Sequence, residues 1–291
     1  MRQIIDTFND DYGNPVFKIY ISSCVAQKQQ KRLHRHTEFE ISLILSGNGI
    51  YNTDLGNFDF FQGDIFLFST NEYHCITDVI NSNGEDYMQI LNIQFAPTFI
   101  YAANRISETS FMNIFLNRTA QFRNLLTRES PHTEQIREKF LSVKRECEEK
   151  KPCYYTEVYN EVVSILIDIY RYYGYAKFQP PQSNLYKDIS GLQKAISYIN
   201  SNFCYDISLD DIATVACTSK FHFMRLFKST YNMTTWDYIN IKRIDKAISL
   251  LSTTDETILN IATQCGFNNS ANFNRIFKKI TQLTPKQYRR N

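Results

Sequence analysis

Two stretches near the C-terminus of this 291-residue sequence repeat each other almost residue by residue. Residues 212–217 are I-A-T-V-A-C and residues 223–228 are F-M-R-L-F-K. Residues 261–266 and 273–278 are I-A-T-Q-C-G and F-N-R-I-F-K, with Phe267 as one extra residue between the two registers. A stacked repeat protein needs about three or more units, so two copies do not make a solenoid. The repeat instead predicts a small helical unit that has been duplicated.

Each copy carries the signals of a helix, a tight turn and a second helix. Ser208 and Thr257 stand where N-caps are expected, each before apolar residues at helical spacing. Gly266 suits a turn that needs a positive φ, and Ser219 and Asn269 are placed to cap the helices that follow. In a helix-turn-helix unit the second helix enters the DNA major groove, where Arg, Asn and Lys contact bases and phosphates.

The second helix of each copy has an apolar and a polar face. Phe223 and Phe273 belong to the apolar face, which we expect to lie in the core. The outward residues are Lys220, His222, Arg225 and Lys228 in the first copy and Ser270, Asn272, Asn274, Arg275 and Lys278 in the second. A single Arg on such a face is usually only solvated. The recurrence of Arg at equivalent positions favours DNA contact.

The C-terminal part, residues 186–291, resembles the AraC/XylS family of bacterial transcription factors. The residues that carry the resemblance are Ala262 with Gly266-Phe267, the F-x-R-x-F-K-K run of 273–279, and T-P-x-x-Y-R in 284–289. Members usually have Gly where this chain has Asn232 and Gln282.

This resemblance implies that two recognition helices read successive major-groove segments of one asymmetric DNA site. The positions that it carries over are Lys220, Phe221, His222, Met224, Arg225, Ser270, Ala271, Asn272, Asn274 and Arg275. Between the units, residues 236–251 are expected to form one rigid helix of about 24 Å, since a helix rises 1.5 Å per residue. A spacer of that length suits two reading helices about one DNA turn apart.

Charge and cysteine usage agree with a DNA-binding protein of the cytoplasm. Residues 186–291 hold 14 Lys and Arg against 8 Asp and Glu, a net charge of +6, whereas residues 1–185 carry −4. Positive charge supplies the salt-dependent part of DNA affinity. Seven scattered cysteines without a C-x-x-C pair predict reduced thiols. The sequence shows neither a signal peptide nor an apolar run of about 18 residues, so we expect no membrane association.

The first hundred residues predict antiparallel β structure. Phe39, Ile41 and Leu43 alternate with polar residues, and Gly-Asn clusters mark turns. Residues 65–68 and 87–95 are further apolar strands. Short strands between turn signals predict a small antiparallel barrel or jelly roll over residues 1–106.

This region resembles the cupin sensor domain that is common in the same regulator family. The first cupin motif is matched by His34, His36, Glu40 and Gly47, and the second in part by His74. In cupin enzymes these histidines and the glutamate bind a divalent metal, which imidazole and carboxylate ligands suit. In sensor domains the resemblance instead implies a pocket for a small organic effector. We expect the effector site at His34, His36, Glu40, His74, Tyr20 and Tyr51 and no bound metal; a purely structural role for these polar residues stays open.

Residues 107–177 are predicted to be a helical segment. Val158, Val162 and Ile165 lie on one strong apolar stripe, which packs either on the barrel or against a second copy. In the family this position carries the dimer contact, so a homodimer is expected. Pro180-Pro181 marks a linker over residues 178–185, because Pro-Pro cannot continue a helix.

The sequence therefore predicts an α+β, multidomain chain: a cupin-like antiparallel β-barrel, a helical dimerisation segment and an all-α double helix-turn-helix domain. The predicted function is a ligand-responsive transcriptional regulator of carbohydrate or other small-molecule metabolism. Its partners would be double-stranded promoter DNA, a small-molecule effector and, for an activator, RNA polymerase. A constitutive DNA-binding regulator is one alternative. A metal-dependent cupin enzyme is the other alternative. The sequence contains no P-loop, G-x-S-x-G or dinucleotide motif that would support an enzyme.

Overall fold

The computed structural model describes residues 2–25, 33–80, 87–102, 110–177 and 185–290. The chain forms two compact units, one of residues 1–31 and 38–185 and the other of residues 32–37 and 186–291. The linker expected at 178–185 lies almost wholly outside the described residues. Each unit has its own core, and each is described here by itself.

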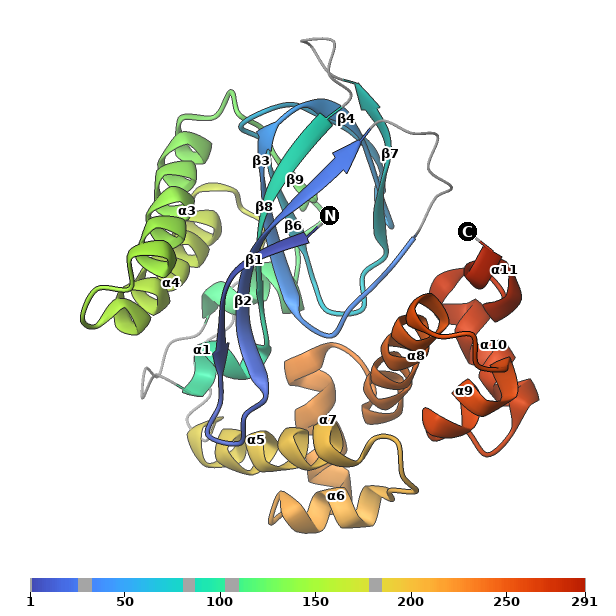
Figure 1. Ribbon diagram of the computed structural model, residues 1–291. Coiled ribbons are helices and arrows are strands. Elements are labelled where there is room, and N and C mark those ends of the chain that lie inside the picture. The colour runs from blue at the N-terminus through green and yellow to red at the C-terminus, as the bar shows by residue number, and fades with distance from the viewer. Residues whose placement is uncertain (1, 26–32, 81–86, 103–109, 178–184, 291) are drawn as a thin grey trace. The chain divides into compact units, whose positions relative to one another are not determined.

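The first unit is built on two antiparallel sheets (Figure 1). The larger sheet has the strand order β1 (Arg2–Asn9), β2 (Pro15–Val25), β8 (Tyr87–Phe95), β3 (Phe39–Ser46), β6 (Ile65–Phe68) and β9 (Leu125–Leu126). The smaller sheet is β5 (Gly56–Phe60), β4 (Asn48–Thr53) and β7 (His74–Ile80). Side chains of both sheets meet in one apolar cluster: Ile44, Tyr51, Phe60, Phe66, Phe68, Met88 and Ile90. The predicted antiparallel β domain is confirmed.

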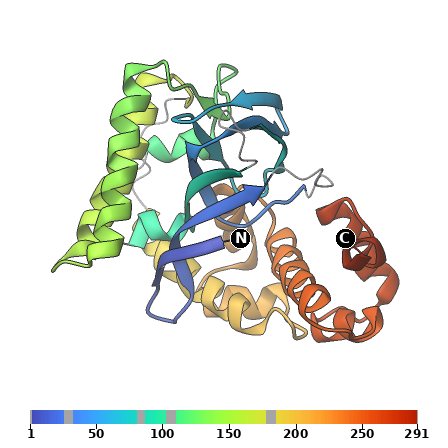
Figure 2. The same cartoon turned by 45° about the horizontal axis from the view of Figure 1, so that its top comes forward.

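A helical hairpin lies beside the larger sheet. The helices α3 (Pro131–Glu149) and α4 (Tyr154–Tyr172) run side by side in both views (Figure 1, Figure 2). Phe8 of β1 contacts the ring of Tyr154 edge-on, and Lys150 pairs with Asp6. The apolar stripe of α4 is fully buried inside the single chain, at Val158, Val162, Ile165, Leu166 and Ile169. The sequence left two partners open for this stripe, the rest of the chain or a second copy. In the structure the rest of the chain covers it.

The segment between strand β8 and the hairpin is less helical than the sequence indicates. It holds α1 (Pro97–Ala102), the 3-10 turn η1 (Ser110–Met112) and α2 (Asn113–Leu116), and then strand β9, which pairs with β6. Asn124, which is fully buried, donates to the carbonyl of Leu67 and to Glu72. A strand of two residues leaves no period in the sequence, so long-range pairing decides its conformation.

Over residues 185–290 the second unit contains helices joined by short turns, and no strand. Its helices are α5 (Leu185–Asn202), α6 (Leu209–Val215), α7 (Lys220–Tyr231), α8 (Thr235–Thr253), α9 (Ile258–Gln264), α10 (Ser270–Thr281) and α11 (Pro285–Arg290). They share one core, to which the repeated Phe223, Phe227, Phe273 and Phe277 contribute fully buried rings. The predicted helix at 236–251 is α8, the spacer between the two copies.

The two copies fold alike down to single hydrogen bonds. In the first turn the amide of Thr218 donates to Ala213, and in the second the amide of Phe267 donates to Ala262. The turn residue has a positive φ in both copies, 53° at Cys217 and 81° at Gly266. The structure therefore contains two helix-turn-helix units, α6–α7 and α9–α10.

Candidate DNA-binding interface and sensor site

The helices α7 and α10 present the side chains that could read DNA. Ser219 caps α7 through the amide of His222, and Asn269 caps α10 through the amides of Ala271 and Asn272. These caps fix each helix start, so the residues of the first turn project outward from a defined point. The exposed candidates are Phe221, Met224, Arg225, Lys228, Asn269, Ser270, Ala271, Asn272, Asn274, Arg275 and Lys278, while Lys220 and His222 are half-buried.

Arg225 and Arg275 are held in the same way in the two copies. The Nη2 atom of Arg225 lies 3.3 Å from Nδ1 of His222, and Nη2 of Arg275 donates to Oδ1 of Asn272 at 2.9 Å. In each case the partner lies three residues earlier, on the same helix face. A guanidinium held in this manner keeps further N–H groups for a base edge or a phosphate. The sequence indicated the arginines but not the residues that orient them.

Two further side chains that were expected to contact DNA also bond to other groups of the chain. Lys220 forms an ion pair with Asp210 at 2.6 Å, and the Asn269 side chain serves its cap. Phe221 is the most exposed large apolar side chain on either helix, at 83%. An aromatic ring so placed suits contact with a thymine methyl group.

The polar part of the first unit centres on Glu40 of β3, which is 3% exposed. Its carboxylate accepts from Nε2 of Gln94 at 2.5 Å and from the Tyr20 hydroxyl at 3.4 Å. Ser42 Oγ lies 2.9 Å from the same carboxylate and 2.8 Å from Oδ1 of Asn92. Burial raises the pKa of Tyr20 well above its usual value, and the charge of Glu40 adds to the rise, so this phenol remains a donor.

His74 reaches the same carboxylate from the other sheet. Its Nε2 lies 3.7 Å from Oε1 of Glu40, and its Nδ1 lies 3.0 Å from the carbonyl of Glu72. A carbonyl only accepts, so Nδ1 carries a proton and Nε2 faces Glu40. The ring stacks on Phe68 at 4.0 Å and is fully buried.

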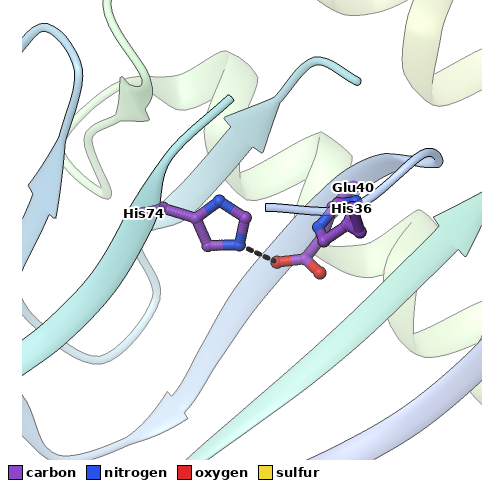
Figure 3. A group of neighbouring side chains, drawn as sticks. All are labelled: His36, Glu40 and His74. Atoms are coloured by element: carbon purple, nitrogen blue, oxygen red, sulfur yellow. Dashed lines mark ion pairs between the residues drawn. The ribbon is translucent and has the colours of Figure 1, made fainter. Parts of the chain in front are cut away.

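The residues of the two cupin motifs are brought together only in part. The ligand atoms of His36, Glu40 and His74 lie within 4.8 Å of one another (Figure 3). His34 is exposed, and strand β3 begins only at Phe39, so His34 and His36 do not lie on the same strand as Glu40. In a tetrahedral zinc site, bonds of 2.0–2.1 Å place neighbouring ligand atoms about 3.3 Å apart. A metal ion would therefore have to draw these side chains closer together.

Tyr51 belongs to the apolar cluster of the first unit, and its ring also lies 6.2 Å from that of His74. Its ring is 4.4 Å from Phe66, 5.1 Å from Phe68 and 6.1 Å from Phe60. The sequence-based prediction named Tyr51 with the effector residues and did not name Gln94 or Asn92, which bond within the Glu40 cluster. Asn92 and Gln94 lie two residues apart on β8, where side chains at alternate positions share one face of the sheet.

A hollow of about 520 Å³ lies elsewhere on this unit, between the β4–β5 hairpin and residues 118–123. Arg118 and Arg123 line it beside Leu55 and Phe58. Arg118 already pairs with Glu72 at 2.9 Å, and Arg123 donates to the carbonyl of Phe122. Both guanidiniums thus serve the local fold.

Two family models match the two parts of the chain. Residues 212–291 match the model of a helix-turn-helix domain, and residues 19–137 match the AraC-like ligand binding domain. The HTH-type transcriptional activator RhaR of Mannheimia succiniciproducens is 25% identical over 258 residues, 88% of this chain and 86% of that protein. The transposon Tn10 TetD protein of Escherichia coli is 38% identical over 100 residues, 34% of this chain and 72% of that protein.

A solved structure has the same fold. The structure of ToxT from Vibrio cholerae superposes with a TM-score of 0.55 at 16% identity, covering 94% of this chain and 98% of that one. Among the described residues no helix is long and apolar enough to cross a membrane. The chain belongs to the AraC/XylS family of transcriptional regulators, with an N-terminal ligand-binding domain and a C-terminal helix-turn-helix domain.

Proposed function

We propose that this regulator reads promoter DNA with α7 and α10 together, and that Arg225 and Arg275 are the central contacts. The observation that carries the proposal is the matched orientation of the two arginines by His222 and Asn272. Bidentate Arg–guanine contacts are the commonest specific contacts in the major groove. The exposed Lys228 and Lys278 at the next helical turn would contact phosphates.

The test compares Arg275→Ala with Arg275→Lys on duplexes selected in vitro from a random library. Loss of a base contact costs about 1–3 kcal/mol and relaxes specificity at one position. Lysine keeps the charge but not the forked geometry, so it should restore phosphate binding without restoring base preference. An equal loss on all duplexes, rescued by lysine, would show that Arg275 contacts only phosphate.

We further propose that the cluster around Glu40 receives a small organic effector rich in hydroxyl groups, of the carbohydrate class. The cluster offers carboxylate, amide, hydroxyl and imidazole groups from both sheets, namely Glu40, Gln94, Asn92, Ser42 and His74. Carboxylate and amide oxygens accept from sugar hydroxyls, and the buried negative charge disfavours an anionic effector. The family includes sensors of sugars, and effector binding would shift the equilibrium between DNA-binding states.

The test of the sensor titrates neutral sugars and polyols against the full chain and measures its Tm and its DNA affinity. Glu40→Gln should abolish the response, and Asp59→Asn on the exposed part of β5 is the matched control. A constitutive regulator is the competing function, and the packing of the Tyr51 ring against Phe66 and Phe68 favours it. If a saturating effector changes neither DNA affinity nor transcription, the protein is a constitutive regulator.

The regulator would act as a homodimer, with RNA polymerase as a further partner if it activates transcription. Since the apolar stripe of α4 is used within the chain, the exposed large side chains Tyr155 and Tyr172 are the part of α4 that we propose to meet a second copy. We propose no catalytic activity for the chain, because its relatives are regulators and the Glu40 cluster is explained by binding.

A further inference from the structure

Two basic side chains of α8 converge on Cys204, in the turn that follows α5. The ammonium of Lys246 donates to Cys204 Sγ at 3.2 Å. Arg243 holds the backbone on either side of the cysteine, through the carbonyls of Phe203 at 2.6 Å and Tyr205 at 3.0 Å. Positive neighbours stabilise a thiolate, which is the reactive form of cysteine. Cys204 is half-buried, so a small reagent can reach it.

A second thiol stands next to this site. Cys265 follows α9 directly and is fully buried. Burial raises the pKa of the Cys265 thiol to about 11, and the neighbouring Cys204 adds to the rise. The two backbones are in contact, because a Cβ at Gly266 would lie 2.6 Å from the carbonyl oxygen of Cys204. Lys246 also donates to the carbonyl of Gln264, at 3.3 Å, and so bridges the two segments.

We propose that Cys204 is a peroxide-reactive modification site and that Cys265 resolves its oxidised form as an intramolecular disulfide. In the first step the Cys204 thiolate attacks one oxygen of hydrogen peroxide. The S–O bond forms, the O–O bond breaks, and the departing hydroxide takes a proton from solvent to leave as water. Sulfur is oxidised to a sulfenic acid and the peroxide is reduced.

In the second step Cys265 attacks the sulfenic sulfur. The S–S bond forms, the S–O bond breaks, and the hydroxyl leaves as water with the proton of the Cys265 thiol. Because Cys265 is a buried neutral thiol, this step is slower than the first. The sulfenic acid therefore accumulates before the disulfide does.

The disulfide would act on the second helix-turn-helix unit. Cys265 immediately precedes Gly266, the turn residue between α9 and α10. Pairing with Cys204 draws the Cys265 side chain out of the core and moves this turn. The recognition helix α10 is then displaced, and DNA affinity falls.

Reactivity is tested first, by timed alkylation of the reduced full chain with iodoacetamide and mass spectrometry of each cysteine peptide. Cys217 is the control, since it is exposed and lies in the α6–α7 turn, which corresponds to the α9–α10 turn next to Cys265. Cys204 should react faster than Cys217 although it is less exposed, and Lys246→Met should slow Cys204 several-fold while leaving Cys217 unchanged. Lys246→Arg, which keeps the charge, should stay close to wild type. Equal rates for the two cysteines would overturn the proposal.

Oxidation is tested next, with hydrogen peroxide, dimedone trapping and disulfide mapping. Early samples should carry dimedone on Cys204 and late samples a Cys204–Cys265 disulfide, and Cys265→Ala should stop at the sulfenic acid. Affinity for a duplex selected in vitro should fall by between about fivefold and a hundredfold, the usual span of regulatory coupling, and dithiothreitol should restore it. A disulfide between other cysteines, or oxidised protein that binds as tightly as reduced protein, would refute the inference. DNA binding by the reduced protein tests the proposed function separately. If the reduced protein binds DNA, that proposal stands whether or not oxidation has an effect.

Discussion

The side chain of Asn272 accepts a hydrogen bond from Arg275 and so orients the guanidinium that projects from α10. Replacing Asn272 with Ala removes this acceptor without disturbing the helix, because Ala has the higher helix propensity. We expect Asn272→Ala to reduce discrimination at the base read by Arg275 by less than the 1–3 kcal/mol expected for loss of the arginine itself. Competition between matched and single-mismatch duplexes measures the difference. A variant that discriminates as well as wild type would show that Arg275 needs no orienting partner.

The turn residues Cys217 and Gly266 adopt the same left-handed conformation but tolerate substitution differently. A Cβ at Gly266 would meet the Cys204 carbonyl oxygen at 2.6 Å. Together with the positive φ, this contact should make Gly266→Ala destabilising by about 2 kcal/mol or more. Cys217→Gly relieves the φ strain while raising the entropy of the unfolded chain, so its net effect should stay within about 1 kcal/mol. Urea unfolding checks both; equal losses would mean that the backbone contact is absent.

The exposed arginines of α7 and α10 follow more directly from the sequence than the grouping of polar residues around Glu40 does. Arg225 and Arg275 follow from a helical period within one short segment, which the sequence contains entirely. The Glu40 cluster instead joins β2, β3, β7 and β8, and only the tertiary pairing of those strands brings its members together. His34 precedes the start of β3 at Phe39 and is exposed, so the motif alone did not show where its side chain lies.

The start of α10 depends on Asn269, whose Oδ1 accepts from two backbone amides. Asn269→Ala should cost about 0.5–2 kcal/mol of stability, the usual value of an N-cap, and should also weaken DNA binding. Asn269→Asp separates the two effects. Aspartate caps equally well and favours the helix dipole, yet it places a negative charge where phosphates approach. Unfolding by urea should show wild-type stability for Asn269→Asp, and titration with DNA should show lower affinity; unchanged affinity would place the α10 N-terminus away from the DNA.

Elements with a clear local apolar pattern were predicted correctly, whereas β9 was not. Strands β6 and β8 lie at the expected 65–68 and 87–95, because their apolar residues specify them locally. Strand β9 fell inside a segment expected to be helical, since its two residues are extended only through pairing with β6. The positive φ of Gln282, at 61°, is likewise set by the end of α10 and not by the preference of Gln.

The division into two compact units leads to a prediction about their separate behaviour. A fragment of residues 178–291 keeps all of α5 and the net charge of +6. We expect it to unfold cooperatively, because its core draws on the helices of this unit alone. It should bind DNA without any response to the effector, while a fragment of residues 1–177 should not bind DNA. A fragment 178–291 that fails to fold would show that its helices need the first unit.

The salt dependence of binding then tests the homodimer. The logarithm of the binding constant falls with the logarithm of salt concentration, with a slope of about −0.9 per phosphate contact. If one copy of the full chain binds DNA, the fragment and the full chain should have the same slope, since all contacts come from α7, α10 and their neighbours. If two copies bind together, the full chain releases counterions from two modules, and its slope should be about twice that of the fragment. We expect the ratio to be near two on DNA that carries paired sites and near one on a duplex with a single site. A ratio of one on both would mean that the regulator binds as a monomer.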